Sequence, residues 1–178
     1  MNQKNYPSPV FHEVQQFRQT WVMFVVLAVA GLQWYAVVEQ LLLGRPFGQN
    51  PMPDSMAFIF WILIGFGLPL FFFYCRLVTE VREDGIYFRY IPFHWSYRRI
   101  AFEDVVRCEV KTYNAIREYG GWGIRWRCKG KAYSVSGNQG IRFELMNGKR
   151  LLIGSQRAED FWQAIPVKYR AQTDKNDL

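Results

Sequence analysis

Two long apolar runs, separated by a short connector rich in Pro and Gly, dominate the first part of the chain. They cover Trp21–Val38 and Met56–Cys75, and neither contains an Asp, Glu, Lys or Arg. A helix of about 20 apolar residues rises about 30 Å, which matches the hydrocarbon core of a bilayer. We therefore predict a transmembrane hairpin over residues 21–75, with its two helices at about 21–43 and 55–77.

The charged residues predict which side of the membrane the rest of the chain occupies. Residues 1–75 sum to zero charge, so the whole net charge of +7 lies from Arg76 onward. Basic residues beside a span favour the cytoplasmic side, and the connector at residues 39–54 holds one Arg against two acids. We expect both termini in the cytoplasm and the connector outside.

A cleaved signal peptide is the alternative interpretation of the first apolar run. Ala28-Val29-Ala30 resembles a cleavage site that follows a short apolar stretch. Against cleavage, the apolar run continues to Val38, and the leader before it is long and nearly uncharged. Even after cleavage, the second helix would leave the C-terminal part of the chain in the cytoplasm.

Beyond Arg76 the spacing of apolar residues changes from helical to alternating. Ile86, Phe88 and Tyr90 alternate with more polar residues, and Asp84-Gly85 and Asn147-Gly148 are hairpin-turn signals. Val106, Cys108 and Val110 share one face of a further expected strand. Other strands are expected at 97–102, 124–128, 141–146 and 150–153.

One amphipathic helix is expected after these strands. Ala158, Phe161, Trp162 and Ile165 stand at helical spacing, and Pro166 ends the pattern. About seven antiparallel strands and one closing helix predict a small all-β barrel or sandwich. The expected organisation is an N-terminal tail at 1–20, the hairpin at 21–75, the β domain at 76–166 and a polar tail at 167–178.

The three cysteines are too few for a disulfide scaffold. Cys75 ends the second apolar run. Cys108 shares a strand face with Val106 and Val110, and Cys128 shares one with Ile124 and Trp126. We interpret them as small buried residues of a protein in a reducing compartment.

Several segments after Arg76 resemble bacterial pleckstrin-homology-like (PH-like) domains. They are Arg99–Val105, Tyr119–Arg125, Gly130–Gly137 and Gly148–Ser155. Together with the hairpin, they resemble a family of small bacterial membrane proteins in which two spans precede such a domain. The resemblance covers about residues 15–165. It implies a seven-stranded PH-like barrel capped by a helix, a place in the bacterial inner membrane, and no established activity.

The residue types that catalysis needs are sparse. Only His12 and His94 are present, without a partner at metal-ligand spacing, and no nucleophile or phosphate-loop motif occurs. We therefore expect no enzyme, no cofactor, no metal and no small-molecule substrate. We also expect no nucleic-acid binding, because the aromatic residues mostly alternate inward.

A glycine-rich corner at residues 120–123 is one candidate contact site. Its glycines permit close backbone approach, so Trp122 could project with Arg117 and Arg125 toward a partner or a lipid headgroup. The plainer alternative is a strained turn whose Trp packs over the end of the β domain.

Four arginines near the membrane are a second candidate. Arg76, Arg82, Arg98 and Arg99 are expected to face anionic headgroups, where each cation gains about 1 kcal/mol. Two hypotheses follow. The first is a non-catalytic module that binds another protein or a second copy of itself. The alternative is a sensor of anionic lipid headgroups on the inner leaflet.

Overall fold

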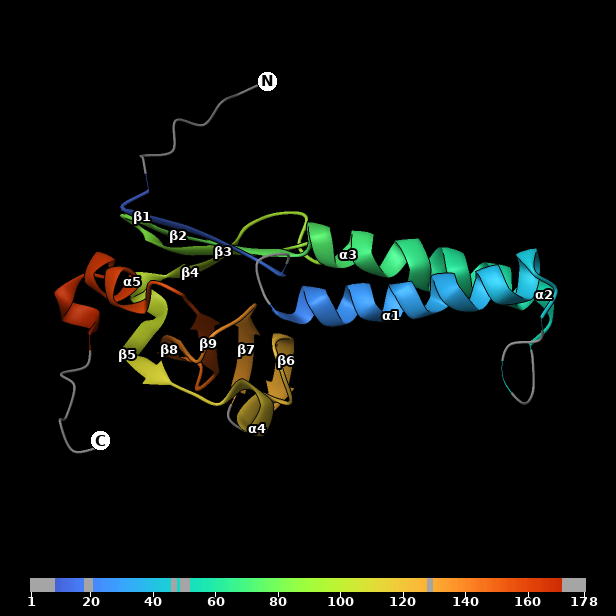
Figure 1. Cartoon of the computed structure of the whole chain (residues 1–178). Helices are drawn as coiled ribbons and strands as arrows, with labels where there is room; N and C mark the ends of the chain where they lie inside the picture. The colour runs from blue at the N-terminus through green and yellow to red at the C-terminus, as the bar shows by residue number, and fades with distance from the viewer. Residues whose placement is uncertain (1–8, 18–20, 46–47, 49–51, 128–129, 171–178) are drawn as a thin grey trace, which may run out of the picture. The chain divides into compact units, whose positions relative to one another are not determined.

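The computed structural model describes residues 9–17, 21–45, 48, 52–127 and 130–170. These residues form two compact units. One unit is Gln16–Cys75, and the other combines the chain up to Gln15 with the chain from Arg76 onward. The second unit is therefore built from one segment that precedes the first unit in the sequence and one that follows it. Figure 1 shows the order of the elements.

The first unit contains the two apolar helices that the sequence predicts. The first helix is α1 (Trp21–Val37), which continues as a π-helical turn to Leu42. The second runs through α2 (Asp54–Phe60), a π-helical stretch (Trp61–Gly67) and α3 (Leu68–Tyr74). With 22 and 21 residues, both helices are long and apolar enough to cross a membrane.

A proline in the second helix leaves one backbone carbonyl to be satisfied by the first helix. Pro69 has no N–H for the carbonyl of Gly65, four residues earlier. The indole Nε1 of Trp34 on α1 donates to that carbonyl at 3.4 Å. A Cβ at position 65 would lie 3.2 Å from the same Nε1. Glycine thus lets the Trp34 indole approach the backbone closely.

The second unit begins with a four-stranded sheet, called sheet A here. Its strands are β1 (Phe11–Gln16), β2 (Arg76–Arg82), β3 (Gly85–Ile91) and β4 (Arg98–Ala101). They lie in the order β1-β2-β3-β4. The expected alternation in β3 is confirmed, because Ile86, Phe88 and Tyr90 are all buried.

Five further strands form sheet B, in the order β5-β8-β9-β7-β6. Their bounds are β5 (Val105–Thr112), β6 (Gly123–Arg127), β7 (Gly130–Ser134), β8 (Gln139–Leu145) and β9 (Arg150–Gly154). The pair β7–β9 is parallel, and the other pairs in this sheet are antiparallel. The described residues form nine strands in two sheets that do not close, where the sequence predicted about seven strands in a barrel or sandwich.

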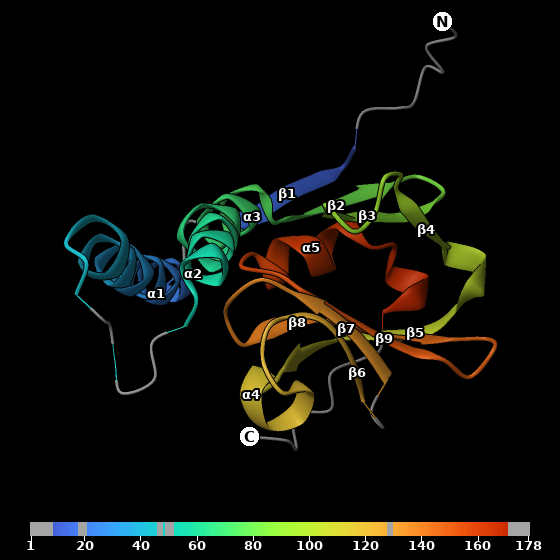
Figure 2. The same ribbon diagram turned by 90° about the vertical axis from the view of Figure 1, so that its right-hand side faces the viewer.

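The two sheets share one apolar core with the helix α5 (Ala158–Ala164), which lies between them in Figure 2. Phe161 of α5 is fully buried, stacks on Phe11 of β1 at 5.1 Å and lies 6.2 Å from Phe143 of β8. One aromatic ring thus contacts residues from both sheets. The expected C-terminal helix is confirmed. A second short helix, α4 (Ala115–Tyr119), was not expected.

The N-terminal segment is a strand where the sequence predicted a loose tail. Val10 N–H donates to the carbonyl of Val81 at 2.9 Å, and Phe17 N–H donates to that of Cys75 at 3.4 Å. The residue numbers rise along β1 while those of its partners on β2 fall, so the two strands are antiparallel. The two strands form a β-hairpin whose connecting loop is the entire helical hairpin.

Buried polar side chains fix β1 to sheet B as well. Glu13 accepts from the hydroxyl of Ser155 at 2.7 Å and from the N–H of Gln156 at 2.9 Å. The Gln15 amide donates to the carbonyl of Gly154 at 2.7 Å. Glu13 and Gln15 are buried although they are polar. The inward positions of β1 therefore lack the apolar alternation by which a strand is predicted from sequence, and the strand was missed.

Other local differences have clear causes. A bulge between Val105 and Arg107 shifts the start of β5, so Val106 is exposed and does not share the buried face of Cys108. The expected tail is folded as far as Arg170, because the ring of Tyr169 stacks on Phe102 at 5.3 Å.

The burial predicted for the cysteines is confirmed at two positions. Cys75 and Cys108 are buried and free, and burial raises the pKa of Cys108 to about 12. Cys128 lies outside the described residues.

The pairing of β1 with β2 predicts that the helical hairpin can be replaced by a short turn. We expect a chain in which Asn-Gly joins Gln16 directly to Arg76 to fold as a soluble domain. A fragment starting at Arg76 lacks β1 and its buried contacts, and should be less stable by about 4 kcal/mol. Urea unfolding followed by tryptophan fluorescence measures the difference.

The matched control for this comparison is Val14→Ala in the turn-linked chain, because Val14 is on the outward face of β1 and partly exposed. This variant should unfold close to the unsubstituted chain. Equal stability with and without β1 would contradict the composite domain.

Candidate functional site: a basic cleft between the two sheets

A cleft of about 920 Å³ opens between sheet A and sheet B. One wall comes from β3 and β4, and the other from β6, β7, β9 and the turn that joins β8 to β9. Both β4 and β6 are edge strands of their sheets. We call this site the basic cleft.

All charged residues among the described lining of the basic cleft are cationic. No Asp or Glu is among the described residues that line it. The basic lining residues are Arg98, Arg99, Arg127, Lys131, Lys149 and Arg150.

Only two of these cations are paired with a carboxylate in the described part of the chain. Arg99 lies 3.1 Å from Asp84, and Arg150 lies 3.1 Å from Glu144. The other four lining cations form no ion pair with a described residue. An excess of positive charge therefore faces the interior of the cleft.

Aromatic rings lie among these cations. The ammonium of Lys131 is 4.7 Å from the ring centre of Trp126 and 4.9 Å from that of Tyr133. Trp126 is 75% exposed, although the sequence pattern predicted that it faces inward. The sequence argument against a basic surface with accessible aromatic residues therefore does not hold here.

A buried histidine lies next to the basic cleft. The His94 ring contacts Tyr133 at 5.5 Å between centres, and its Nδ1 accepts from the N–H of Tyr90 at 3.2 Å. Burial lowers the pKa of His94, and the positive charges of Arg98 and Lys131 lower it further. His94 is thus neutral at pH 7, and it senses cations from both sheets.

The glycine-rich corner forms a different kind of site. Trp122 donates from Nε1 to the carbonyl of Gly137 at 3.0 Å and packs against a buried cluster that includes Tyr113 and Tyr119. This geometry favours the plainer interpretation, a turn whose Trp packs on the domain. A pocket of about 450 Å³ lies beside Trp122, with the exposed Ile116 at its rim.

A model described as "Family of unknown function (DUF6141)" matches residues 3–170. The chain belongs to this family. No curated protein and no solved structure matches it. The family description gives no activity and does not mention a PH-like domain.

In this DUF6141 chain, the predicted headgroup arginines do not form one site. Arg98 and Arg99 both line the basic cleft. Arg76 is exposed at the start of β2. Arg82 instead belongs to a polar cluster on the outer face of sheet A, described below.

The arginines of the glycine-rich corner lie outside the basic cleft. Arg125 donates from Nε to the carbonyl of Trp122 at 3.1 Å. Arg117 lies on α4, where the side chain of Asn114 caps its backbone N–H. Neither arginine is among the residues that line the cleft.

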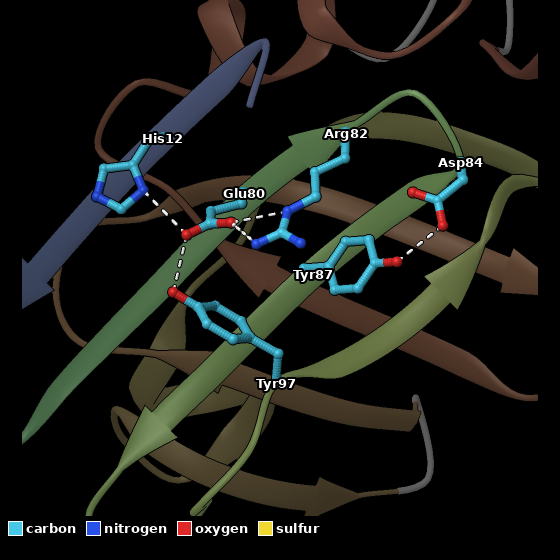
Figure 3. Close-up of polar contacts among 6 residues, drawn as sticks. All are labelled: His12, Glu80, Arg82, Asp84, Tyr87 and Tyr97. Carbon is cyan, nitrogen blue, oxygen red and sulfur yellow. Dashed lines mark hydrogen bonds and ion pairs between the residues drawn. The ribbon is translucent and has the colours of Figure 1, made fainter. Parts of the chain in front are cut away.

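The polar cluster on sheet A is centred on Glu80 (Figure 3). Glu80 accepts from Arg82 at 2.6 Å and from the hydroxyl of Tyr97 at 2.8 Å, and lies 3.3 Å from His12 of β1. The guanidinium of Arg82 also lies over the ring of Tyr87, 4.4 Å from its centre. Arg82 is therefore a structural residue that links strands of sheet A.

The electrostatics of Glu80 fit this structural role. Burial alone would raise the pKa of Glu80, but hydrogen bonds from Tyr97 and Arg82 and the nearby charges of Arg82 and His12 outweigh it. The net effect lowers the pKa below its ordinary value. The charged form of Glu80 is thus stabilised by folding.

Sequence reasoning missed most of the basic cleft. Arg127, Lys131, Lys149 and Arg150 were not singled out, because they lie on different strands and turns. One signal was present, since every second residue from Arg125 to Lys131 is basic and no acid lies between them. Among the described residues, no group of three His, Cys, Asp or Glu could hold a metal ion.

The lowered pKa of Glu80 predicts how its contribution to stability depends on pH. The contribution is full above the unfolded pKa, near 4.5, and is lost as the pH falls through the lower folded value. Glu80→Gln should therefore cost about 1–3 kcal/mol at pH 7, and the difference should shrink below pH 4.5.

Denaturant unfolding of the full chain in detergent micelles, between pH 2 and 8, measures this difference. Glu103→Gln is the matched control, because Glu103 is exposed and outside the cluster. A pH-independent loss for Glu80→Gln would show that the charge of Glu80 is not what stabilises sheet A.

Proposed function

We propose that this chain is a non-catalytic protein of the bacterial inner membrane whose cytosolic domain docks on anionic ligands at the membrane surface. The two helices span the bilayer as a hairpin, and the domain is joined to both of its ends. This is the anionic-headgroup hypothesis of the sequence, now assigned to a particular site. The observation that carries it is the basic cleft, with its six cations and no described acidic residue.

Two features support the orientation in this proposal, and a third argues against cleavage of the first helix. The pairing of β1 with β2 requires the chain before the first helix and the chain after the second to be on the same side of the membrane. The net charge of +7 lies entirely after Arg76, which favours the cytoplasmic side. Cleavage after Ala30 would also remove β1 and its buried contacts with Ser155 and Gly154.

The residue types that line the cleft are the reason why we propose a non-catalytic function. Its charged lining residues are all Arg or Lys, and no carboxylate, His or Cys is among the described lining residues. Such a set can bind an anion, but it lacks the paired acid and base that most hydrolytic and transfer reactions use. A PH-like relationship of the domain stays a prediction from the resemblance.

A protein partner, or a second copy of this chain, is the second candidate function. The observation that favours it is the 450 Å³ pocket beside Trp122, with Ile116 62% exposed at its rim. An apolar side chain of a partner would fit such a pocket. Ile116 is the better residue to probe, because Trp122 is used within the domain.

Docking predicts that the cleft moves closer to a bilayer as anionic lipid is added. The test uses the full chain in nanodiscs, with a donor dye on Met146→Cys in a background without native cysteines. Met146 is exposed and directly precedes the lining residue Asn147, but it does not line the cleft. Energy transfer to an acceptor lipid should rise between neutral discs and discs with about one-third anionic lipid, and high salt should reverse it.

Charge reversal locates the effect. Arg98→Glu combined with Lys131→Glu should abolish the rise in transfer. Arg117→Glu combined with Lys168→Glu removes the same charge from exposed positions outside the cleft and should leave the rise in place. Equal transfer at every anionic content would contradict docking, as would equal effects of the two charge-reversed pairs.

A further inference from the structure

The basic cleft has the dimensions of a small-ligand site as well as a positive charge. Its volume of about 920 Å³ is within the range of pockets that enclose small molecules, about 300–1,000 Å³. A merely basic surface, which attracts any anion, needs no such hollow. A discrete small group could therefore fit between the sheets.

Four cations in the cleft are available to a ligand. Arg98, Arg127, Lys131 and Lys149 form no ion pair with a described residue, and each comes from a different segment of the fold. Basic residues on edge strands also deter unwanted strand pairing, which accounts for Arg98 on β4 and Arg127 on β6. It does not account for Lys131 on the inner strand β7 or for Lys149 near a turn.

Cations line both walls of the cleft. Arg98 of sheet A and Lys131 of sheet B line the same hollow, and the charge of each also lowers the pKa of the buried residue His94. Two like charges thus lie on opposite walls of one cleft without a described counter-charge. An anion placed there would relieve their repulsion.

The rest of the cleft wall is apolar or aromatic. Ile100, Leu145 and Leu151 line it, together with the exposed ring of Trp126. The hydroxyl of Tyr133, another lining residue, is buried and has no hydrogen-bond partner among the described residues. Buried polar groups are normally hydrogen-bonded, so this hydroxyl could donate to an acceptor that enters the cleft.

We propose that the basic cleft binds a phosphomonoester carried on a partly apolar organic body. The phosphate group lies between Arg98 and Lys131, and the organic body lies against Trp126 and the apolar wall. This inference rests on the proposed anionic docking and adds the chemical class of the ligand. An anionic lipid headgroup and a soluble phosphate ester share this chemistry.

The charge of the ligand follows from the charge of the cleft. A phosphomonoester carries between one and two negative charges at pH 7 and three acceptor oxygens, whereas a phosphodiester carries one charge. Four available cations favour the more highly charged group. Arg and Lys are also the side chains best suited to phosphate oxygens.

The test measures binding of soluble probes to the full chain in nanodiscs of neutral lipid. The probes are dihexanoyl phosphatidic acid, dihexanoyl phosphatidylglycerol, glycerol 3-phosphate and succinate. Phosphatidic acid carries the monoester and phosphatidylglycerol the diester. Succinate provides two negative charges without phosphate. We expect phosphatidic acid to bind at least tenfold more tightly than phosphatidylglycerol or succinate.

Glycerol 3-phosphate distinguishes the two sources of the phosphate group. Affinity equal to that of dihexanoyl phosphatidic acid indicates a soluble phosphate ester. Much weaker binding indicates a lipid headgroup, because the apolar wall then contributes to affinity. Weaker binding of glycerol 3-phosphate supports the inference, whereas equal affinity would contradict the apolar body and leave only recognition of the phosphate group.

Single variants test the assigned residues. Arg98→Gln and Lys131→Gln should each weaken phosphatidic acid binding at least fivefold. Tyr133→Phe should weaken binding without lowering fold stability, because it removes a hydroxyl that has no described partner. The matched controls Arg117→Gln and Lys168→Gln lie outside the cleft and should leave the affinity unchanged.

His94 provides a readout that does not depend on affinity. The chain contains only two histidines, so NMR of isotope-labelled histidine resolves His94 once His12→Gln identifies the other signal. Bound phosphate beside Arg98 and Lys131 should raise the pKa of His94 by half a unit or more. Arg98→Gln should raise it even without ligand, because one of the causes of the lowered pKa is removed.

The outcomes separate this inference from the proposed function. If phosphatidic acid, phosphatidylglycerol and succinate bind according to charge alone, and cleft variants weaken them all, anionic docking stands and the phosphomonoester is wrong. If none of the probes binds, or if the controls weaken binding as much as the cleft variants, both fail. Tighter binding of an oligonucleotide without a terminal phosphate would overturn the inference in favour of nucleic acid.

Discussion

The pairing of β1 with β2 is the interaction on which the rest of the structure depends. It joins a strand before the helical hairpin to a strand after it, in one antiparallel pair of sheet A. The hairpin is therefore an insertion within the domain. If the hairpin spans a membrane, both of its ends emerge on the same side, and the domain cannot be completed until the second helix has been made. Neither consequence depends on the sequence of the spans.

The same strand explains where the basic cleft lies. The inward side chains of β1, Glu13 and Gln15, hold sheet A to the end of β9 in sheet B. The strands β4 and β6 are left as edges, and the cleft lies between sheets whose edges do not pair. A closed barrel would have removed these edges and the hollow with them. The open side of the domain is thus the side that can receive a ligand.

The sequence predicted those parts of the fold that use apolar alternation or long apolar runs. The two helices and the strand through Ile86, Phe88 and Tyr90 were recognised for this reason. The strand β1 was missed because Glu13 and Gln15 occupy its inward positions, and the partners that make them acceptable inside lie about 140 residues away. No local pattern contains that information.

The candidate site was predictable only in part, for a related reason. Arg98 and Arg99 were predicted as contact residues because they follow the second apolar run in the sequence. Arg82 was predicted for the same reason, but it is paired with Glu80 within sheet A. Lys131 of β7 and Lys149, which directly precedes β9, reach the same cleft because β7 and β9 pair in parallel. Charge counting cannot distinguish a paired cation from an available one without the fold.

The most direct test of the composite domain is a disulfide between β1 and β2 in the intact protein. The Nδ1 atom of His12 lies 3.3 Å from Oε1 of Glu80, so these residues are opposite each other on β1 and β2. In an antiparallel pair, the residues two positions further along, Val14 and Val78, are then also opposite each other. We predict that Val14→Cys with Val78→Cys, in a chain without native cysteines, forms an intramolecular disulfide in isolated membranes under mild oxidation. No disulfide, or one that links two chains, would contradict the domain in which both flanks of the hairpin form one sheet.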